Sequence, residues 1–89
     1  MSVYSISYDL RTPGKSYSEL YKAIKSIGDY QHPLESTWFV STSFLGSHSI
    51  YEELSETIDK NDSLFVTKVT ADYSGWMPKE FWEWLRKNV

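Results

Sequence analysis

The chain has 89 residues, a length that fits one small domain, and its 12 acidic and 9 basic side chains give a net charge of −3. Cysteine is absent, which excludes disulfide bonds, zinc–thiolate sites and cysteine nucleophiles. No apolar run approaches the roughly 20 residues of a membrane span and no leader pattern is found, so we expect a soluble, cytoplasmic protein without a membrane partner.

The first predicted elements are a strand over residues 3–10 and the helix that follows it. Alternation at period two is typical of a strand that packs one face. The side expected to pack carries Tyr4, Ile6, Tyr8 and Leu10, and the opposite side carries Val3, Ser5, Ser7 and Asp9. Ser16 and Glu19 match a capping box at the start of the helix. Gly28 stands where the end of a helix favours a left-handed residue.

The second half of the chain predicts a hairpin, a helix, a strand and a final helix. The hairpin joins a short strand over residues 29–32 to a stronger one over 36–42, and Pro33 confines the first to a sheet edge. A helix follows Gly46, and a strand covers residues 63–70. Pro78 suits the first turn of a helix that ends at about residue 88. We expect this tail to cover sheet or dimer surface with Trp76, Phe81, Trp82, Trp84 and Leu85.

The order β-α-β-β-α-β plus a C-terminal helix predicts a ferredoxin-like α+β sandwich. In this fold, right-handed crossovers place both main helices on one face of a four-stranded sheet. We expect a single domain over residues 1–89, with its core in residues 3–70 and an added Trp-rich helix at about 78–88.

Charge is distributed unevenly along the chain, with sums of +2 for residues 1–28, −6 for 29–66 and +1 for 67–89. A local anion-binding face in the first third would use Arg11 and Lys15, and these are the candidate nucleic-acid-binding residues. The acidic net charge does not favour a nucleic-acid partner. Charge that is merely scattered and solvated is the alternative interpretation.

Asp9 is the candidate catalytic and metal-binding residue. It closes a strand of otherwise uncharged residues, on the side of Ser5 and Ser7. A carboxylate at a strand end suits Mg²⁺ or Mn²⁺, which take oxygen ligands, and two carboxylates across a dimer axis would suit them better. The alternative is that Asp9 caps the turn at Arg11 and Thr12 with its own side chain.

Residues 3–70 resemble the small ferredoxin-like CRISPR-associated proteins, the second protein of the adaptation machinery. The likeness rests on three segments, which are Ile6-Ser7-Tyr8-Asp9-Leu10, Ser36-Thr37-Trp38-Phe39 and Asp62-Ser63-Leu64-Phe65-Val66. A nearer likeness is to uncharacterised bacterial and mobile-element proteins labelled "SinR family". They share Gly-Asp-x-x-His-Pro-Leu-x-Ser-Thr-Trp, which residues 28–38 match throughout. Virulence-associated protein D, a toxin-like ribonuclease, is similar in fold.

The resemblance implies a homodimer in which Asp9 of each protomer lies near the two-fold axis. In members that are nucleases, it implies Mg²⁺ or Mn²⁺ as the cofactor at that residue. We place Phe39 and Trp38 at the expected dimer interface. The family's basic residues after the first helix are not matched, since this chain has residues 29–32 of sequence Asp-Tyr-Gln-His there. That departure counts against nucleic-acid binding and cleavage.

Two functions therefore stay open. One is a non-catalytic interaction or adaptor module, related to CRISPR-associated or toxin–antitoxin proteins. The alternative is a divalent-metal-dependent endonuclease, a phosphodiesterase that uses paired Asp9 carboxylates at the dimer axis. The acidic balance of the chain favours the first, and the position of Asp9 favours the second.

Overall fold

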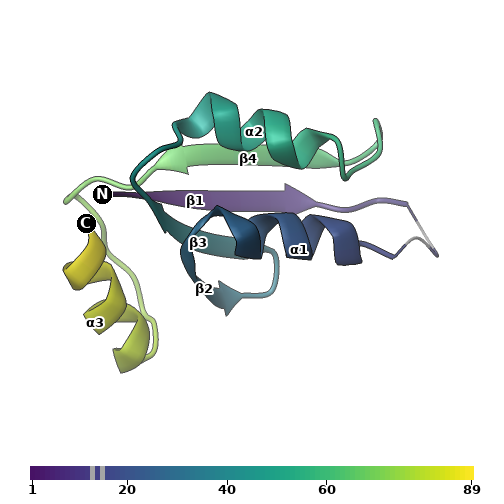
Figure 1. Ribbon diagram of the computed structural model, residues 1–89. Helices are drawn as coiled ribbons and strands as arrows, with labels where there is room; N and C mark the ends of the chain where they lie inside the picture. Colours follow the sequence, from purple (N-terminus) through teal and green to yellow (C-terminus); the bar gives the residue numbers. More distant parts are fainter. Residues whose placement is uncertain (13, 15) are drawn as a thin grey trace.

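The computed structural model describes residues 1–12, 14 and 16–89. Its four strands form one antiparallel sheet in the order β2-β3-β1-β4. Helices α1 and α2 lie on one side of this sheet, and α3 lies near the end where both chain termini are found (Figure 1). The elements are β1 (Ser2–Asp9), α1 (Ser18–Ile27), β2 (Asp29–Leu34), β3 (Thr37–Thr42), α2 (Ser47–Ser55), β4 (Ser63–Lys68) and α3 (Lys79–Asn88).

This arrangement is the predicted ferredoxin-like α+β fold with an added C-terminal helix. The connection β1-α1-β2 passes over β3, and the connection β3-α2-β4 passes over β1. Strands β3 and β1 are therefore the two central strands, and they pair antiparallel with each other. Among the residues that the structure describes, no helix combines the length and the apolar character needed to cross a membrane.

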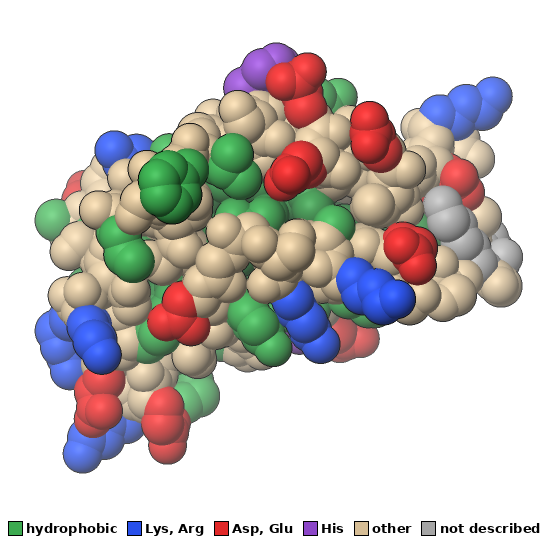
Figure 2. Space-filling model, in the orientation of Figure 1, with side chains coloured by type: hydrophobic (Ala, Val, Ile, Leu, Met, Phe, Trp, Pro, Cys, Tyr) green, Lys and Arg blue, Asp and Glu red, His purple; other side chains and the backbone are tan. Residues whose placement is uncertain are grey.

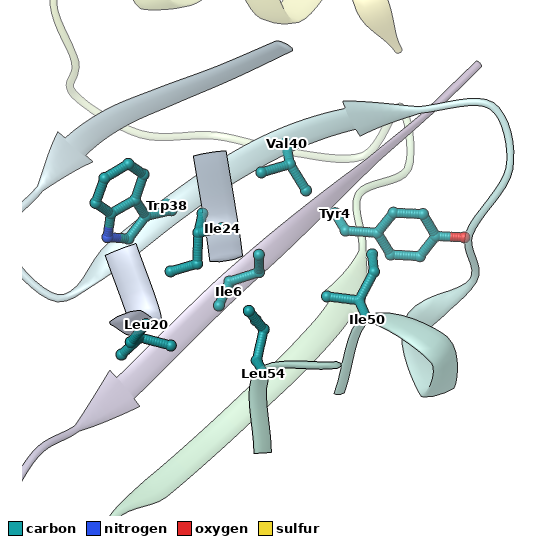
Figure 3. Close-up of a cluster of buried hydrophobic side chains, with 8 residues drawn as sticks. All are labelled: Tyr4, Ile6, Leu20, Ile24, Trp38, Val40, Ile50 and Leu54. Carbon is teal, nitrogen blue, oxygen red and sulfur yellow. The ribbon is translucent and has the colours of Figure 1, made fainter. Parts of the chain in front are cut away.

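The main core lies between the sheet and helices α1 and α2. Strands β1 and β3 and helices α1 and α2 each contribute two buried side chains, and all eight point into the space between the sheet and the helices (Figure 3). They are Tyr4, Ile6, Leu20, Ile24, Trp38, Val40, Ile50 and Leu54. The alternation predicted for β1 is confirmed, because Tyr4, Ile6 and Tyr8 pack in this cluster while their neighbours face the other way.

A second, smaller cluster holds α3 against the other face of the sheet. Val3, Phe81 and Leu85 are its buried members. The rings of Phe39 and Phe81 meet edge to face, with centroids 4.8 Å apart, and Trp84 Nε1 donates a hydrogen bond of 3.0 Å to Asp29 Oδ2. The predicted covering role of the tail therefore holds for these side chains.

Trp76 covers no sheet surface within its own chain, where its side chain is 99% exposed, and its expected place on a dimer surface stays a prediction. Trp76 lies in the segment that connects β4 to α3, before the helix begins, so the packing of α3 does not bury it. Trp82 and Trp84 are half-buried beside the second cluster.

Several element ends differ from the predictions. Helix α1 begins at Ser18 after the N-cap Tyr17. Ser16 Oγ accepts the backbone N–H of Ser18 at 3.4 Å, and not that of Glu19 as a capping box requires. The end of the helix at Gly28 has φ 171°, which is extended backbone and not left-handed. Strand β2 continues to Leu34, with a register irregularity after Gln31 where Pro33 has no N–H to donate.

Candidate functional site: the uncovered face of the sheet

Helix α3 covers only one end of the sheet face that turns away from α1 and α2. Its contacts centre on Val3, Phe39 and Val69, which lie toward the start of β1. Beyond α3, at Ser7 of β1, one row of side chains on this face runs across all four strands. The register places Leu34 opposite Thr37, Thr37 opposite Ser7, and Ser7 opposite Phe65. We call these four residues the uncovered row.

The uncovered row has apolar ends and a small polar centre. Leu34 on edge strand β2 is 48% exposed, and Phe65 on edge strand β4 is 67% exposed. In the centre, the hydroxyls of Ser7 and Thr37 are hydrogen-bonded to each other at 3.1 Å. One hydroxyl donates to the other, so the pair leaves a single O–H that a covering molecule would have to accept or exclude from water.

The uncovered row carries no charge, in contrast to the rest of the surface. On the side of the molecule seen in Figure 2, charged side chains of both signs are spread over the surface and acidic ones gather over α2. The acidic residues of α2 are Glu52 and Glu53, with Glu56 just after it. A charged surface of this kind stays solvated, whereas an uncharged row with exposed Phe and Leu favours contact with another molecule.

Asp9 lies at the end of β1, opposite Ser63 and on the same face as the uncovered row. Its side chain is 60% exposed, and Oδ2 accepts hydrogen bonds from Arg11 Nη2 at 2.7 Å and from Arg11 Nε at 2.9 Å. The sequence suggested a cap for the turn at Arg11, but the carboxylate instead binds the Arg11 guanidinium. An exposed pair of this kind contributes about 1 kcal/mol or less to stability.

The residues of one chain do not fit a Mg²⁺ or Mn²⁺ site at Asp9. Within the described part of the chain, no three His, Cys, Asp or Glu side chains are grouped so that they could hold a metal. A cation that binds Oδ2 would also compete with the Arg11 guanidinium. The metal-binding prediction therefore depends on a second copy of the chain.

The residue that organises this end of the sheet is Asp62, which the sequence reasoning did not single out. Its Oδ1 accepts the backbone N–H of Arg11 at 2.7 Å, and both of its carboxylate oxygens lie 2.9 Å from the Tyr17 hydroxyl. Its Oδ2 also accepts the N–H of Asp59 at 2.9 Å. Asp62 thus ties the chain after β1 to the loop before β4 and fixes the backbone from which Arg11 reaches Asp9.

The predicted nucleic-acid-binding residues are only partly described. Arg11 is engaged by Asp9 through its side chain and by Asp62 through its backbone. Lys15 lies outside the described residues. Because the guanidinium of Arg11 already has a carboxylate partner, phosphate binding there would compete with an internal ion pair.

The predicted interface residues Trp38 and Phe39 are both engaged inside the chain. Trp38 is 3% exposed on the helix side, where its ring stacks on His32 with centroids 3.8 Å apart. Phe39 packs on Phe81 under α3. An interface on the uncovered face would thus draw on other side chains, and Leu34 and Phe65 are the exposed ones.

Tyr8 joins the indole of Trp38 to the β2–β3 turn. Its hydroxyl accepts a hydrogen bond of 2.9 Å from Trp38 Nε1 and donates one of 3.4 Å to the carbonyl of Glu35. Burial is the main cause that raises the pKa of the Tyr8 hydroxyl above its ordinary value. The hydroxyl therefore stays protonated at neutral pH and keeps both hydrogen bonds, which holds the turn before β3 in place.

Sheet order and helix placement define a ferredoxin-like α+β protein, and comparison with known proteins agrees with this class. No family model and no curated protein matches the chain. Among solved structures, it is similar to a hypothetical protein from Thermus thermophilus with a TM-score of 0.62 and 18% identity. The match covers 86% of this chain and 94% of that one. At this identity, the likeness shows the fold alone.

Proposed function

We propose that the protein is a non-catalytic, homodimeric interaction module, as its resemblance to CRISPR-associated and toxin–antitoxin proteins implies. The observation that carries the proposal is the uncovered row, which is uncharged and exposes Phe65 by 67% and Leu34 by 48%. An uncharged row that exposes Phe and Leu side chains across a sheet favours contact with a partner. The occupant that we propose is a second copy of the chain, packed face to face on the sheet.

Helix α3 limits how two copies can meet, because it lies on the same face over Val3 and Phe39. A two-fold axis parallel to the strands would bring both α3 helices between the two sheets, so the axis that we propose runs across the strands. The two α3 helices then lie at opposite ends of the contact, and the small pair Ser7 and Thr37 lies in its middle.

The engagement of Asp9 supports a module without catalysis. A metal-dependent phosphodiesterase needs carboxylates that are free to hold the cation, and here Arg11 occupies Oδ2 with two hydrogen bonds. The acidic stretch of residues 29–66 would also repel a polyanionic substrate.

Replacing Phe65 with lysine should split the dimer. The change puts a charge in the contact and removes the largest apolar side chain of the uncovered row, so the dimer dissociation constant should rise by about 100-fold or more. Light scattering coupled to size exclusion would report twice the chain mass for the wild type and the single chain mass for Phe65→Lys. The matched control is Phe44→Lys at a position that is 95% exposed outside the sheet, which should stay dimeric. A wild type that is monomeric at micromolar concentration contradicts the proposal.

Nuclease assays test the absence of catalysis. Wild type and Asp9→Asn should both leave labelled single- and double-stranded RNA and DNA intact, with Mg²⁺, with Mn²⁺ and with chelator. Cleavage by the wild type that needs metal and is lost in Asp9→Asn would favour the alternative endonuclease. Asp9→Asn removes the charge that a metal needs while keeping the shape of the side chain.

A further inference from the structure

A cleft opens on the helix side of the sheet, between the end of β1, helix α1 and the β2–β3 turn. Its volume is about 570 Å³, and the residues that line it are Tyr8, Asp9, Leu10, Tyr21, Glu35 and Ser36. It lies toward the end of β1, whereas α3 packs near the start of β1 on the other face. The cleft is therefore separate from the surface that we assign to the homodimer.

The turn that forms one wall of the cleft is tied to β1. The N–H of Tyr8 donates to the carbonyl of Ser36 at 3.1 Å, and the Tyr8 hydroxyl donates to the carbonyl of Glu35 at 3.4 Å. His32 Nε2 lies 3.1 Å from the same carbonyl oxygen of Glu35. These contacts fix the turn, so the cleft is preformed and a ligand need not order it.

Two tyrosine rings form the aromatic side of the cleft. The ring centroids of Tyr8 and Tyr21 lie 6.3 Å apart, and Tyr21 stacks on the buried Trp38 with centroids 6.0 Å apart. This packing holds both tyrosine rings in place. The face of an aromatic ring attracts cations, so the cleft favours a positively charged ligand.

The charged side chains of the cleft are acidic. Among the residues that the structure describes, those that line the cleft include Asp9 and Glu35 but no Lys, Arg or His. Asp9 is paired with Arg11, whereas Glu35 is exposed and takes part in no ion pair within the described chain. Burial is the largest cause that raises the pKa of the Tyr8 hydroxyl, and the negative charge of Glu35 raises it further. The Glu35 carboxylate therefore acts at the aromatic side of the cleft.

We propose that this cleft binds the guanidinium group of an arginine side chain from a partner protein. A guanidinium is planar, so it can stack on a tyrosine ring while its N–H groups donate in pairs to one carboxylate. An ammonium group is a more strongly hydrated point charge and matches this combination less well. The inference goes beyond the proposed homodimer, because it gives the protein a second contact surface that does not depend on the first.

Titration with amino-acid derivatives tests the cleft, with amide chemical shifts as the readout. N-acetyl-arginine amide should shift the amides of Tyr8, Tyr21 and Glu35, with saturation in the millimolar range because one side chain in an open cleft binds weakly. N-acetyl-citrulline amide has nearly the same shape without the charge and should cause no saturable shift. N-acetyl-lysine amide should bind about threefold more weakly than the arginine derivative, or weaker still.

Two variants of the protein locate the site. Glu35→Gln should weaken arginine binding by about fivefold, because it keeps the size of the side chain but removes the negative charge. The matched control is Glu53→Gln, which removes the same charge on α2 outside the cleft and should leave the affinity unchanged. Both positions are exposed, and unchanged amide shifts away from the replaced residue show that each variant is folded.

Each outcome decides for or against the cleft. Saturable arginine binding that Glu35→Gln weakens and Glu53→Gln does not weaken supports the inference. Absence of saturable binding overturns it, as does equal binding of the citrulline or the lysine derivative, because the guanidinium then makes no difference. Equal affinity of the two variants, or shifts confined to residues outside the cleft, also overturns it. Light scattering measures the oligomeric state separately, so a monomeric wild type refutes the proposed function and leaves this inference standing.

Discussion

Replacing Phe81 with alanine should lower the free energy of unfolding by about 3–5 kcal/mol, the usual cost of truncating a buried aromatic side chain. Phe81 is 3% exposed and is the central contact between α3 and the sheet, where its ring meets Phe39 edge to face. The second cluster has only three fully buried members, so the loss of one leaves a cavity that its neighbours cannot fill. Urea unfolding followed by tryptophan fluorescence measures the change.

The matched control for this prediction is Phe44→Ala, which removes the same side chain at a position that is 95% exposed. Its effect should stay within about 0.5 kcal/mol, as is usual for surface substitutions. In a domain of this size, each kcal/mol corresponds to about 4–8 °C in melting temperature, so the two variants should differ clearly in a thermal scan as well. Equal stability of the two variants would contradict the packing of α3 on the sheet.

The elements that the sequence predicts best are those that local pattern alone determines. The alternation of residues 3–10 predicts both the strand and the face that packs. Successive side chains of a strand point to opposite faces, so the apolar set must share one face. The apolar spacing of Leu20 and Ile24 in α1, and of Ile50 and Leu54 in α2, predicts their burial for the same reason. Fold class follows from the order of the elements, since the number of allowed connections is small.

Features that depend on contacts between distant residues could not be predicted from local pattern. The sequence shows Asp62 only as the first residue of the segment that leads into the last strand, whereas its partners Arg11 and Tyr17 lie 51 and 45 residues away. Trp38 was expected at an interface because it is large and aromatic, but α1 and β2 bring Tyr21 and His32 against its ring and enclose it. Size and polarity alone do not decide whether an aromatic residue is used inside the chain or between chains.

In the candidate site, too, local pattern predicts some features, and contacts between distant residues determine the others. The sequence identifies Asp9 as the charged end of its strand, and the structure places it there at the edge of the uncovered face. The pairing with Arg11 depends on the backbone that Asp62 fixes, so it could not be predicted. Similarly, the uncovered row combines one residue from each of four strands, and its register emerges only when the sheet is assembled.

Replacing Gly28 with alanine should destabilise the protein by about 3 kcal/mol or more, at the upper end of the cost of overpacking. The reason is not the left-handed conformation that the sequence suggests, because φ is 171° and any residue can adopt it. A Cβ at Gly28 would instead collide with the backbone carbonyl of Ser41, whose carbon lies 3.2 Å from the Cβ position. Both sides of that contact are backbone, so neither can move aside as a flexible side chain would.

Gly46→Ala is the matched control, since an added Cβ at Gly46 meets nothing within 4 Å. Asp29, the residue after Gly28, pairs with Ser41, so a displaced Ser41 should loosen β2 from β3 first. Hydrogen exchange of the amides in β2 should therefore speed up in Gly28→Ala beyond the change that global stability explains, while β4 follows the global change. If Gly28→Ala is as stable as Gly46→Ala, the backbone at Gly28, between α1 and β2, does not lie in close contact with the backbone of Ser41. The position of edge strand β2, and with it the place of Leu34 in the uncovered row, would then have to be revised.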